Sequence, residues 1–575
     1  MITRPTITQT PSVLIDGAVA LVLCAVIFGL VLMAREWQAP LQSAVVINLS
    51  PWALPGYAAL SFLRGIAAYG LSLLFTLIYG YTAAHAPRAE RIMIPILDIL
   101  QSIPVLGFLP GAVVAFMAVF PDTNMGLELV SILMIFSGQV WNMTFSFYYS
   151  LKNIPSDLRE AAAVYHFNWW QRFCRLELPA SIVGLSWNSM MSMAGGWFFL
   201  MICEAFTLGE HSFRLPGLGS YMSVAIAEHN VPAIIAGSCA MMGIIACVDF
   251  LIWRPVLVWA QKFRLEDTAS AAHEDSRLLR WMRRSWLLRQ LRARVTHPIS
   301  EQLSTPTPPA PLPAPSPMAA PRPFRLPSAV RVASVLFGLA CASVVVVGGI
   351  RFAQLLLALP LAAWQEIFSG ALLTWLRVMG AVALGSLWTV PVGIWIGQSD
   401  RRRKRLQPLV QMAASFPAPM LYPLVVILLH RAGWEMELTA VILMLLGTQW
   451  YLLFNIIAGA STVPEDLREA AAAYHFTPKQ RWWIVWWPAV FPYLITGWVT
   501  AAGGAWNASI VAEYVSAERR LHVAHGLGSM ISISAGAGQP VVLAAGVVTM
   551  VVIVVVMNRL CWRPLQRFAQ VRYAA

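Results

Sequence analysis

The chain has 575 residues, of which 58% are hydrophobic and only 12% are charged, and its mean hydropathy is +0.65. Soluble domains carry about 25% charged residues, so this composition excludes an aqueous globular protein. The formal net charge of +13 does not indicate a nucleic-acid partner, because the basic clusters occupy alternate loops between apolar segments, as the positive-inside rule predicts. The chain is therefore expected to be a polytopic membrane protein.

Apolar segments follow one another along the whole chain, and a helix needs about 20 residues to cross the hydrocarbon layer. Hydropathy predicts six spans in the first half, at 12–34, 57–84, 91–118, 126–150, 179–203 and 231–253. Six more are predicted in the second half, at 329–349, 366–397, 406–430, 437–459, 488–512 and 538–560. The first segment is longer than the apolar part of a signal peptide and is expected to be retained. The fold class expected is all-α, with about twelve transmembrane helices.

An internal repeat divides the chain. The segment PSDLREAAAVYHF at 155–167 recurs as PEDLREAAAAYHF at 464–476, an offset of 309 residues. The offset persists downstream, where Glu204 and Glu513 each precede a Gly-Leu-Gly. Upstream it becomes 313, so that Arg64 aligns with Arg377. The repeat predicts two homologous six-helix halves, 1–260 and 329–575.

The intervening segment, 261–328, differs in composition from both halves. Residues 306–327 contain ten prolines and are expected to form an extended spacer. Residues 276–295 carry seven arginines among Leu, Trp and Met. Two interpretations of residues 276–295 stay open: an amphipathic helix on an anionic leaflet, or a solvated basic linker.

Arginine placement predicts the topology. Basic residues follow the second span of each half, the repeated loops follow the fourth, and the basic linker and the C-terminus follow the sixth. All of these segments lie on one side of the membrane, which is then the cytoplasmic side and holds both termini.

The repeated segments are expected to be short helices. Asp157 and Asp466 each come two residues after a proline, in a position suited to the positive end of a helix. The small alanines leave a flat surface that suits a groove on another protein, and the neighbouring Arg and Glu can orient that contact. The alternative is an ordinary connecting helix, which two near-identical copies in otherwise diverged halves disfavour.

The repeated segments resemble the EAA loop of bacterial ATP-binding-cassette importer permeases. Glu160-Ala-Ala162 is followed by Leu178-Pro179, and Glu469-Ala-Ala471 is followed by Pro488, with Trp487 in place of the Leu. The flanking features resemble the nitrate, taurine and aliphatic-sulfonate branch: Arg64 and Arg377, Ser102-Ile-Pro104 and Ser415-Phe-Pro417, and the two glutamates ahead of Gly-Leu-Gly.

The resemblance implies a type I (MetI-like) importer permease in the bacterial inner membrane, with two permease domains fused in one chain. It implies a path for a small solute, such as nitrate, a sulfonate or a related organic acid, and an extracytoplasmic solute-binding protein. Two ATP-binding subunits would dock on the EAA loops through Arg159, Glu160, Ala161, Ala162 and His166, and through Arg468, Glu469, Ala470, Ala471 and His475.

ATP and Mg would be bound by those partner subunits. None of the four lysines of this chain lies in a Gly-Lys-Ser/Thr sequence, which a Walker A loop requires, so no cofactor is expected here. A membrane enzyme would need clustered His, Asp or Glu, whereas the ten histidines are dispersed and the seven cysteines form no CxxC. No catalytic or metal site is predicted. A scaffold or sensor that retains the permease fold without transport is the alternative function.

Both EAA loops depart from the family pattern, because His166 and His475 stand where the family usually has glycine. Three explanations stay open: a turn with positive φ, in which His is one of the better-tolerated residues; contact with the ATPase; and pH sensing.

Four charged residues are candidates for the path or its gate. Glu204 and Glu513 lie at the outer ends of the fifth spans, where they either face the path or hold the following Gly-Leu-Gly loop. Arg64 and Arg377 either attract an anion or pair with a helix end or a lipid phosphate.

Overall fold

The computed structural model describes residues 29–39, 45–101, 103–208, 211–263, 346–517 and 520–573, with the isolated residues 17 and 343. The proposed linker helix at 276–295, the proline-rich spacer, and most of the predicted spans 12–34 and 329–349 lie outside the described residues.

The first half is built of helices joined by short loops. Its helices are α2 (Leu54–His85), α3 (Pro87–Gln101), α4 (Leu109–Val119), α5 (Met125–Lys152), α6 (Ser156–Val164), α7 (Trp169–Arg172), α8 (Leu178–Glu204), α9 (Leu218–Ala227), α10 (Val231–Val248) and α11 (Arg254–Ala260). The strands β1 (Ala205–Leu208) and β2 (His211–Arg214) pair antiparallel, with Ala205 opposite Arg214.

The second half repeats this order. Its helices are α16 (Leu361–Gly397), α17 (Asp400–Ser415), α18 (Tyr422–Arg431), α19 (Met436–Ser461), α20 (Glu465–Ala473), α21 (Pro478–Gln480), α22 (Trp487–Ala512), α23 (Leu527–Gly536), α24 (Pro540–Met557) and α25 (Arg563–Tyr573). The strands β3 (Tyr514–Ala517) and β4 (Arg520–Val523) form the matching hairpin, with Tyr514 opposite Val523. The predicted helical fold with an internal repeat is therefore confirmed, and the two hairpins are an addition to it.

Within the described residues, seven helices are long and apolar enough to cross a membrane, or eight if one bent pair counts as a single span. This is fewer than the twelve predicted, for reasons that the structure makes clear. The predicted first spans fall mostly outside the described residues. Helix α8 matches the predicted fifth span but is not among the seven, because serines and Asn188 lower its hydropathy.

The predicted spans at 91–118 and 406–430 are wrong as single helices. The helical segments 87–101 and 105–119 meet at 83°, and α17 ends at Ser415 before α18 begins at Tyr422. Each break contains a proline, Pro104 or Pro417, with φ of −64° or −70° and an extended ψ. Proline has no N–H for the helical ladder and disfavours helix at the residue before it. Pro95 and Pro408 nevertheless lie inside α3 and α17, so the extended ψ at Pro104 and Pro417 distinguishes the breaks.

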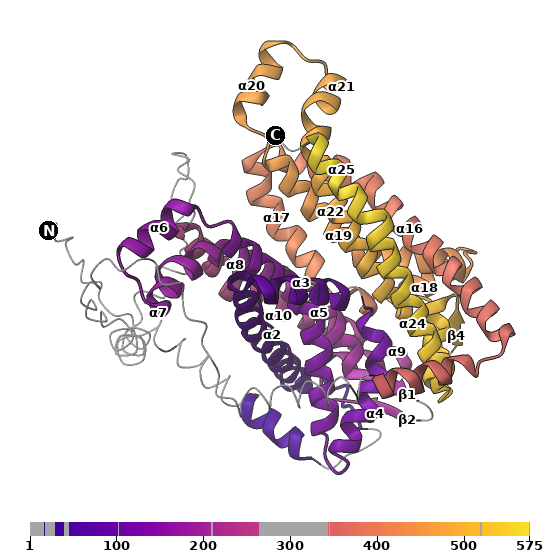
Figure 1. The fold of residues 1–575 in the computed structure, drawn as a ribbon. Coiled ribbons are helices and arrows are strands. Elements are labelled where there is room, and N and C mark those ends of the chain that lie inside the picture. The colour runs from indigo at the N-terminus through magenta and orange to yellow at the C-terminus, as the bar shows by residue number, and fades with distance from the viewer. Residues whose placement is uncertain are drawn as a thin grey trace.

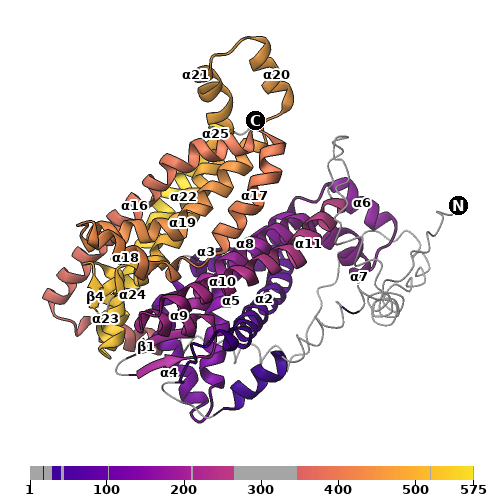
Figure 2. The ribbon, with the colours of Figure 1, turned by 180° about the vertical axis from the view of Figure 1, so that it is seen from behind.

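The two halves pack against each other around one continuous core. Buried residues of both halves, among them Trp197 and Trp506, belong to the same apolar cluster. Figures 1 and 2 show the halves meeting where α8 and α17 lie against each other. The backbone N–H of Val105 also donates to Oδ1 of Asn507 in the other half over 2.7 Å.

The halves diverge toward one end of the molecule. Helices α6 and α7 stand at that end of the first half, and α20 and α21 stand at that end of the second (Figure 1). The hairpins and α9 and α23 lie toward the other end, so the EAA segments and the Gly-Leu-Gly loops occupy opposite ends of the protein.

Candidate functional site: two buried ion clusters, a central cavity and two exposed loops

An ion cluster lies at the end of α8 in the first half. The guanidinium of Arg64 donates to both carboxylate oxygens of Glu128, over 2.6 and 2.7 Å, and also to Glu204. Ser61 Oγ donates to the same carboxylate of Glu204 over 2.6 Å. The three charged side chains are at most 1% exposed. Because buried charges need partners, each member of this cluster depends on the others.

The second half contains the matching cluster. Arg377 donates from Nη1 to Glu513 over 2.6 Å and from Nη2 to Glu437. Thr374 takes the place of Ser61 and donates to Glu513 over 2.8 Å. Glu437 is 44% exposed whereas Glu128 is fully buried. The two clusters therefore use equivalent positions but differ in their access to solvent and in the arginine contact, which has two hydrogen bonds to Glu128 and one to Glu437.

Both clusters hold the Gly-Leu-Gly loop. The backbone N–H of Gly219 donates to Oε2 of Glu204 over 2.6 Å, and that of Gly528 donates to Glu513 over 2.9 Å. A β-carbon on Gly219 would lie 2.7 Å from the carbonyl oxygen of Met201. Glycine is required here because the backbone approaches α8 so closely.

The two ion clusters contain all four residues that the sequence offers as candidates for the path or its gate. Arg64 and Arg377 pair with carboxylates of their own half. These carboxylates lie at helix ends: Glu204 and Glu513 at the ends of α8 and α22, and Glu128 and Glu437 in the first turns of α5 and α19. Glu128 and Glu437 were missed from the sequence, although the offset of 309 relates them. A direct role of the four predicted residues in the path stays a prediction.

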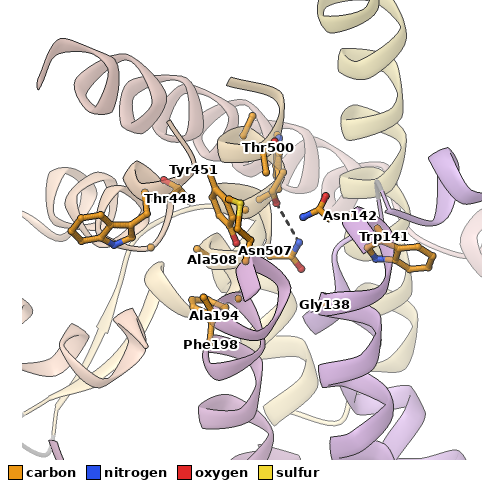
Figure 3. Close-up of a pocket in the computed structure, with 18 of the residues that line it drawn as sticks. Gly138, Trp141, Asn142, Ala194, Phe198, Thr448, Tyr451, Thr500, Asn507 and Ala508 are labelled. Carbon is orange, nitrogen blue, oxygen red and sulfur yellow. Dashed lines mark hydrogen bonds between the residues drawn. The ribbon is translucent and has the colours of Figure 1, made fainter. Parts of the chain in front are cut away.

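A cavity of about 230 Å³ lies between the halves. The side chains that line it come from α5, α8, α17, α19, α22 and neighbouring segments, as Figure 3 shows for part of the lining. None of the described residues that line it is Asp, Glu, His, Lys or Arg. Arg64, Arg377, Glu204 and Glu513 are not among the lining residues.

The polar groups of the cavity are amides and hydroxyls. Asn142 on α5 and Tyr451 on α19 are repeat-equivalent, and neither side chain forms a hydrogen bond to another described residue. Gln411 adds a buried Oε1 that accepts no hydrogen bond from the described part of the chain. Asn142 on α5 and Asn507 on α22 both line the cavity (Figure 3). The cavity therefore offers uncharged hydrogen-bonding groups from both halves.

The EAA segments form the short helices α6 and α20, as the sequence predicts, with Asp157 and Asp466 in their first turns. Their second alanines, Ala162 and Ala471, are buried, whereas Glu160 is exposed. The exposed residues include large apolar and aromatic ones: Leu158, Tyr165, Leu467 and Tyr474. Exposed apolar side chains gathered on a protruding helix are typical of an interaction surface.

The arginines of the two segments bind within the chain. Nη2 of Arg159 donates to the carbonyl oxygens of Leu151 and Lys152, each over 2.9 Å. Nη1 of Arg468 donates to the carbonyl oxygen of Gln398 over 3.3 Å, and its guanidinium lies 5.6 Å from the ring centre of Trp486. These arginines therefore fix each loop to its own half, a contact that the sequence did not predict.

The turn after each EAA helix has the positive φ that a glycine at this position would readily adopt. His166 has φ of 50° and His475 has φ of 49°. The N–H of His166 bonds to Ala163 and that of Phe167 to Ala162, each over 3.0 Å, which is the Schellman arrangement. The second loop has the same bonds at His475 and Phe476. Of the three explanations left open for these histidines, the turn with positive φ describes their backbone.

Comparison with known proteins agrees with this architecture. The profile of the family described as binding-protein-dependent transport system inner membrane component matches residues 72–252 and 389–560, more than half of the chain. The taurine transport system permease protein of Escherichia coli is 29% identical over 206 residues, which are 36% of this chain and 69% of that protein. The nitrate import permease protein of Synechocystis sp. is 26% identical over 137 residues, 24% of this chain and 48% of that protein.

A putative aliphatic sulfonates transport permease protein of Bacillus subtilis is 25% identical over 150 residues, which are 26% of this chain and 51% of that protein. The chain thus spans about half the length of two of these relatives. All three are permease subunits, so a transport component rather than an enzyme is confirmed, as is the predicted kinship with nitrate, taurine and sulfonate permeases. The chain belongs to the family of binding-protein-dependent transport system inner membrane components and contains two copies of its domain.

Proposed function

We propose that this chain supplies both permease domains of an ATP-driven importer on one polypeptide. Each EAA loop docks on one ATP-binding subunit, which binds ATP and Mg, and an extracytoplasmic solute-binding protein delivers the solute. The observation that carries this proposal is the presence of two matching EAA helices, α6 and α20, that stand exposed at one end of the molecule.

The orientation of the chain follows from the positive-inside rule. The EAA end also carries the basic loops, for example Arg401 to Arg405 at the start of α17. That end is therefore cytoplasmic, and the hairpins and Gly-Leu-Gly loops lie on the outer side. Both termini then lie on the cytoplasmic side.

The central cavity is the proposed path, and its cargo is a small solute. A small anion remains the proposed class, in keeping with relatives named for nitrate and aliphatic sulfonates. Because the described lining carries no formal charge, such an anion would be held by amide and hydroxyl donors such as Asn142 and Tyr451, and not by an ion pair.

The two ion clusters act on the path indirectly. Glu204 is the last residue of α8 and Glu513 directly follows α22, and both helices contribute residues to the cavity. By fixing the outer ends of these helices to α2 and α16, the clusters position the cavity lining. Arg64, Arg377, Glu204 and Glu513 would therefore affect the gate indirectly, by holding α8 and α22 in place.

The docking assignment is tested by charge reversal in both EAA loops. Glu160→Arg combined with Glu469→Arg should abolish co-purification of the ATP-binding subunit while the chain still inserts in the membrane. Glu228→Arg reverses an exposed glutamate that directly follows α9, and α9 lies at the opposite end of the molecule. It serves as the control, with co-purification unchanged. Full retention of the ATP-binding subunit by the double variant would contradict the assignment and favour a membrane scaffold or sensor.

A further inference from the structure

The two EAA segments match each other far better than the segments beside them do. Residues 155–167 and 464–476 are identical at eleven of thirteen positions. The thirteen residues before them, 142–154 and 451–463, share one identity, and the thirteen after them, 168–180 and 477–489, share four. The match therefore begins and ends with the exposed loop.

Contacts inside the chain do not explain this match. Most of the shared residues are exposed, among them the tyrosines, with 74% of Tyr165 and 78% of Tyr474 accessible. The shared arginine contacts different groups in the two halves. Arg159 binds carbonyls at the end of α5, whereas Arg468 binds Gln398 and lies over Trp486. The requirement for the same residues must then come from outside the chain.

The histidine turns give a second observation. A non-glycine residue with φ near 50° is strained by about 1–2 kcal/mol relative to glycine, so glycine would form the same Schellman turn more easily. A third histidine, His229, forms such a turn after α9 with φ of 55°, and its repeat equivalent in the second half is Gly538, with φ of 63°. At that turn the two halves use His and Gly interchangeably. Both EAA turns keep the histidine, and both imidazoles are exposed.

From these observations we infer that both EAA loops bind the same surface on two copies of a single ATP-binding subunit, and that the imidazoles of His166 and His475 are part of the contact. The inference rests on the proposed function. The matching surface has an apolar recess for the leucine and tyrosine of each loop, Leu158 with Tyr165 and Leu467 with Tyr474. It has a donor group for the carboxylate of Glu160 or Glu469.

The first test concerns the identity of the partner. The tagged chain is purified from native membranes, and the complex is weighed by native mass spectrometry. We expect one kind of ATP-binding polypeptide at two copies per chain. Glu160→Arg alone and Glu469→Arg alone should each reduce this to one copy of the same polypeptide. Two different ATP-binding polypeptides, each lost with a different single variant, would overturn the inference but leave the proposed function intact. Recovery of no ATP-binding subunit with the unaltered chain would contradict the proposed function itself.

The second test concerns the histidines, and His229 supplies a matched control. His166→Gly combined with His475→Gly relieves the backbone strain, so the thermal stability of the chain should be unchanged or higher. The apparent dissociation constant for the ATP-binding subunit recovered in the first test, added back to stripped chain, should rise about tenfold, which is the loss of one contact of about 1.4 kcal/mol. His229→Gly should leave that constant unchanged. Wild-type affinity in the double glycine variant would restrict the two histidines to a turn role and overturn this part of the inference.

Discussion

Arg563, at the start of α25, forms an ion pair with Asp98 on α3 of the other half. The repeat equivalents of these two residues are Arg254 and Gln411. Arg254 pairs instead with Asp249 of its own half, over 3.0 Å. The ion pair of Arg563 therefore links the two halves, whereas the ion pair of its repeat equivalent, Arg254, lies within one half.

A double-mutant cycle should detect the tie between the halves. Arg563 is 44% exposed, and partly exposed ion pairs contribute about 0.5–1 kcal/mol, so Asp98→Asn and Arg563→Gln should couple by about that amount in reversible unfolding in mixed micelles. The charge swap Asp98→Arg with Arg563→Asp should recover part of the loss. Arg254→Gln should add independently to Asp98→Asn. Additive effects of Asp98→Asn and Arg563→Gln would show that their ion pair contributes nothing.

Removing one buried cation should destabilise the first half strongly. Arg64→Leu leaves Glu128 and Glu204 buried without their counter-ion, and breaking a buried pair in this way costs about 3–5 kcal/mol. Arg377→Leu should cost less, because the exposed Glu437 can be hydrated. Reversible unfolding in mixed micelles gives the loss of stability for each variant and shows which loss is larger. Adding Glu128→Gln and Glu204→Gln to Arg64→Leu should recover part of the stability, and an equal cost for the two arginines would contradict the account.

The Gly-Leu-Gly loop should not accept even a methyl group. Gly219→Ala would place Cβ 2.7 Å from the carbonyl oxygen of Met201, and overpacking of this kind costs about 1–3 kcal/mol. Gly243→Ala on α10 is the matched control, because no atom lies within 4 Å of its Cβ position. There the change should be neutral or should raise stability by about 0.5–1 kcal/mol, as expected within a helix. Equal thermal stability of the two variants would refute the close packing described for the loop.

The cavity should be open to water, unlike the outer surface of the helices. Gly503 lines the cavity, and no atom lies within 4 Å of its Cβ position. In a background without other cysteines, Gly503→Cys should react with a water-soluble maleimide, whereas Gly243→Cys, exposed on α10 within a candidate span, should react at least tenfold more slowly. Similar rates at both positions would be inconsistent with a hydrated path.

Much of the fold could be predicted from the sequence, because hydropathy and the internal repeat act on whole segments. Hydropathy predicts unbroken helices across Pro104 and Pro417, whereas the structure has a break at each. A hydropathy window averages over a proline, and the direction that the chain takes after it depends on packing. The hairpins were missed because strands of four residues leave no readable alternation.

The sites were predictable to different degrees. The EAA loops and the glycine-like turns at His166 and His475 were visible because the repeat marks them. Glu128 and Glu437 were overlooked since each lies near the start of a predicted span and resembles a flanking charge. The cavity could not be predicted, because Gly, Ala and aromatic residues that line it have the same pattern as residues packed in a core.

The central claim is that ATP binding by subunits seated on the two EAA loops moves the halves relative to each other. Asn153 and Thr462 are repeat-equivalent, exposed, and lie at the EAA ends of α5 and α19. Spin labels on Asn153→Cys and Thr462→Cys report the separation of the halves by electron–electron double resonance, in the complex purified with its ATP-binding subunits. We predict a shorter distance with ATP than without nucleotide, since closure of the subunit pair draws the two loops together. An unchanged distance distribution in a complex that hydrolyses ATP would contradict the account.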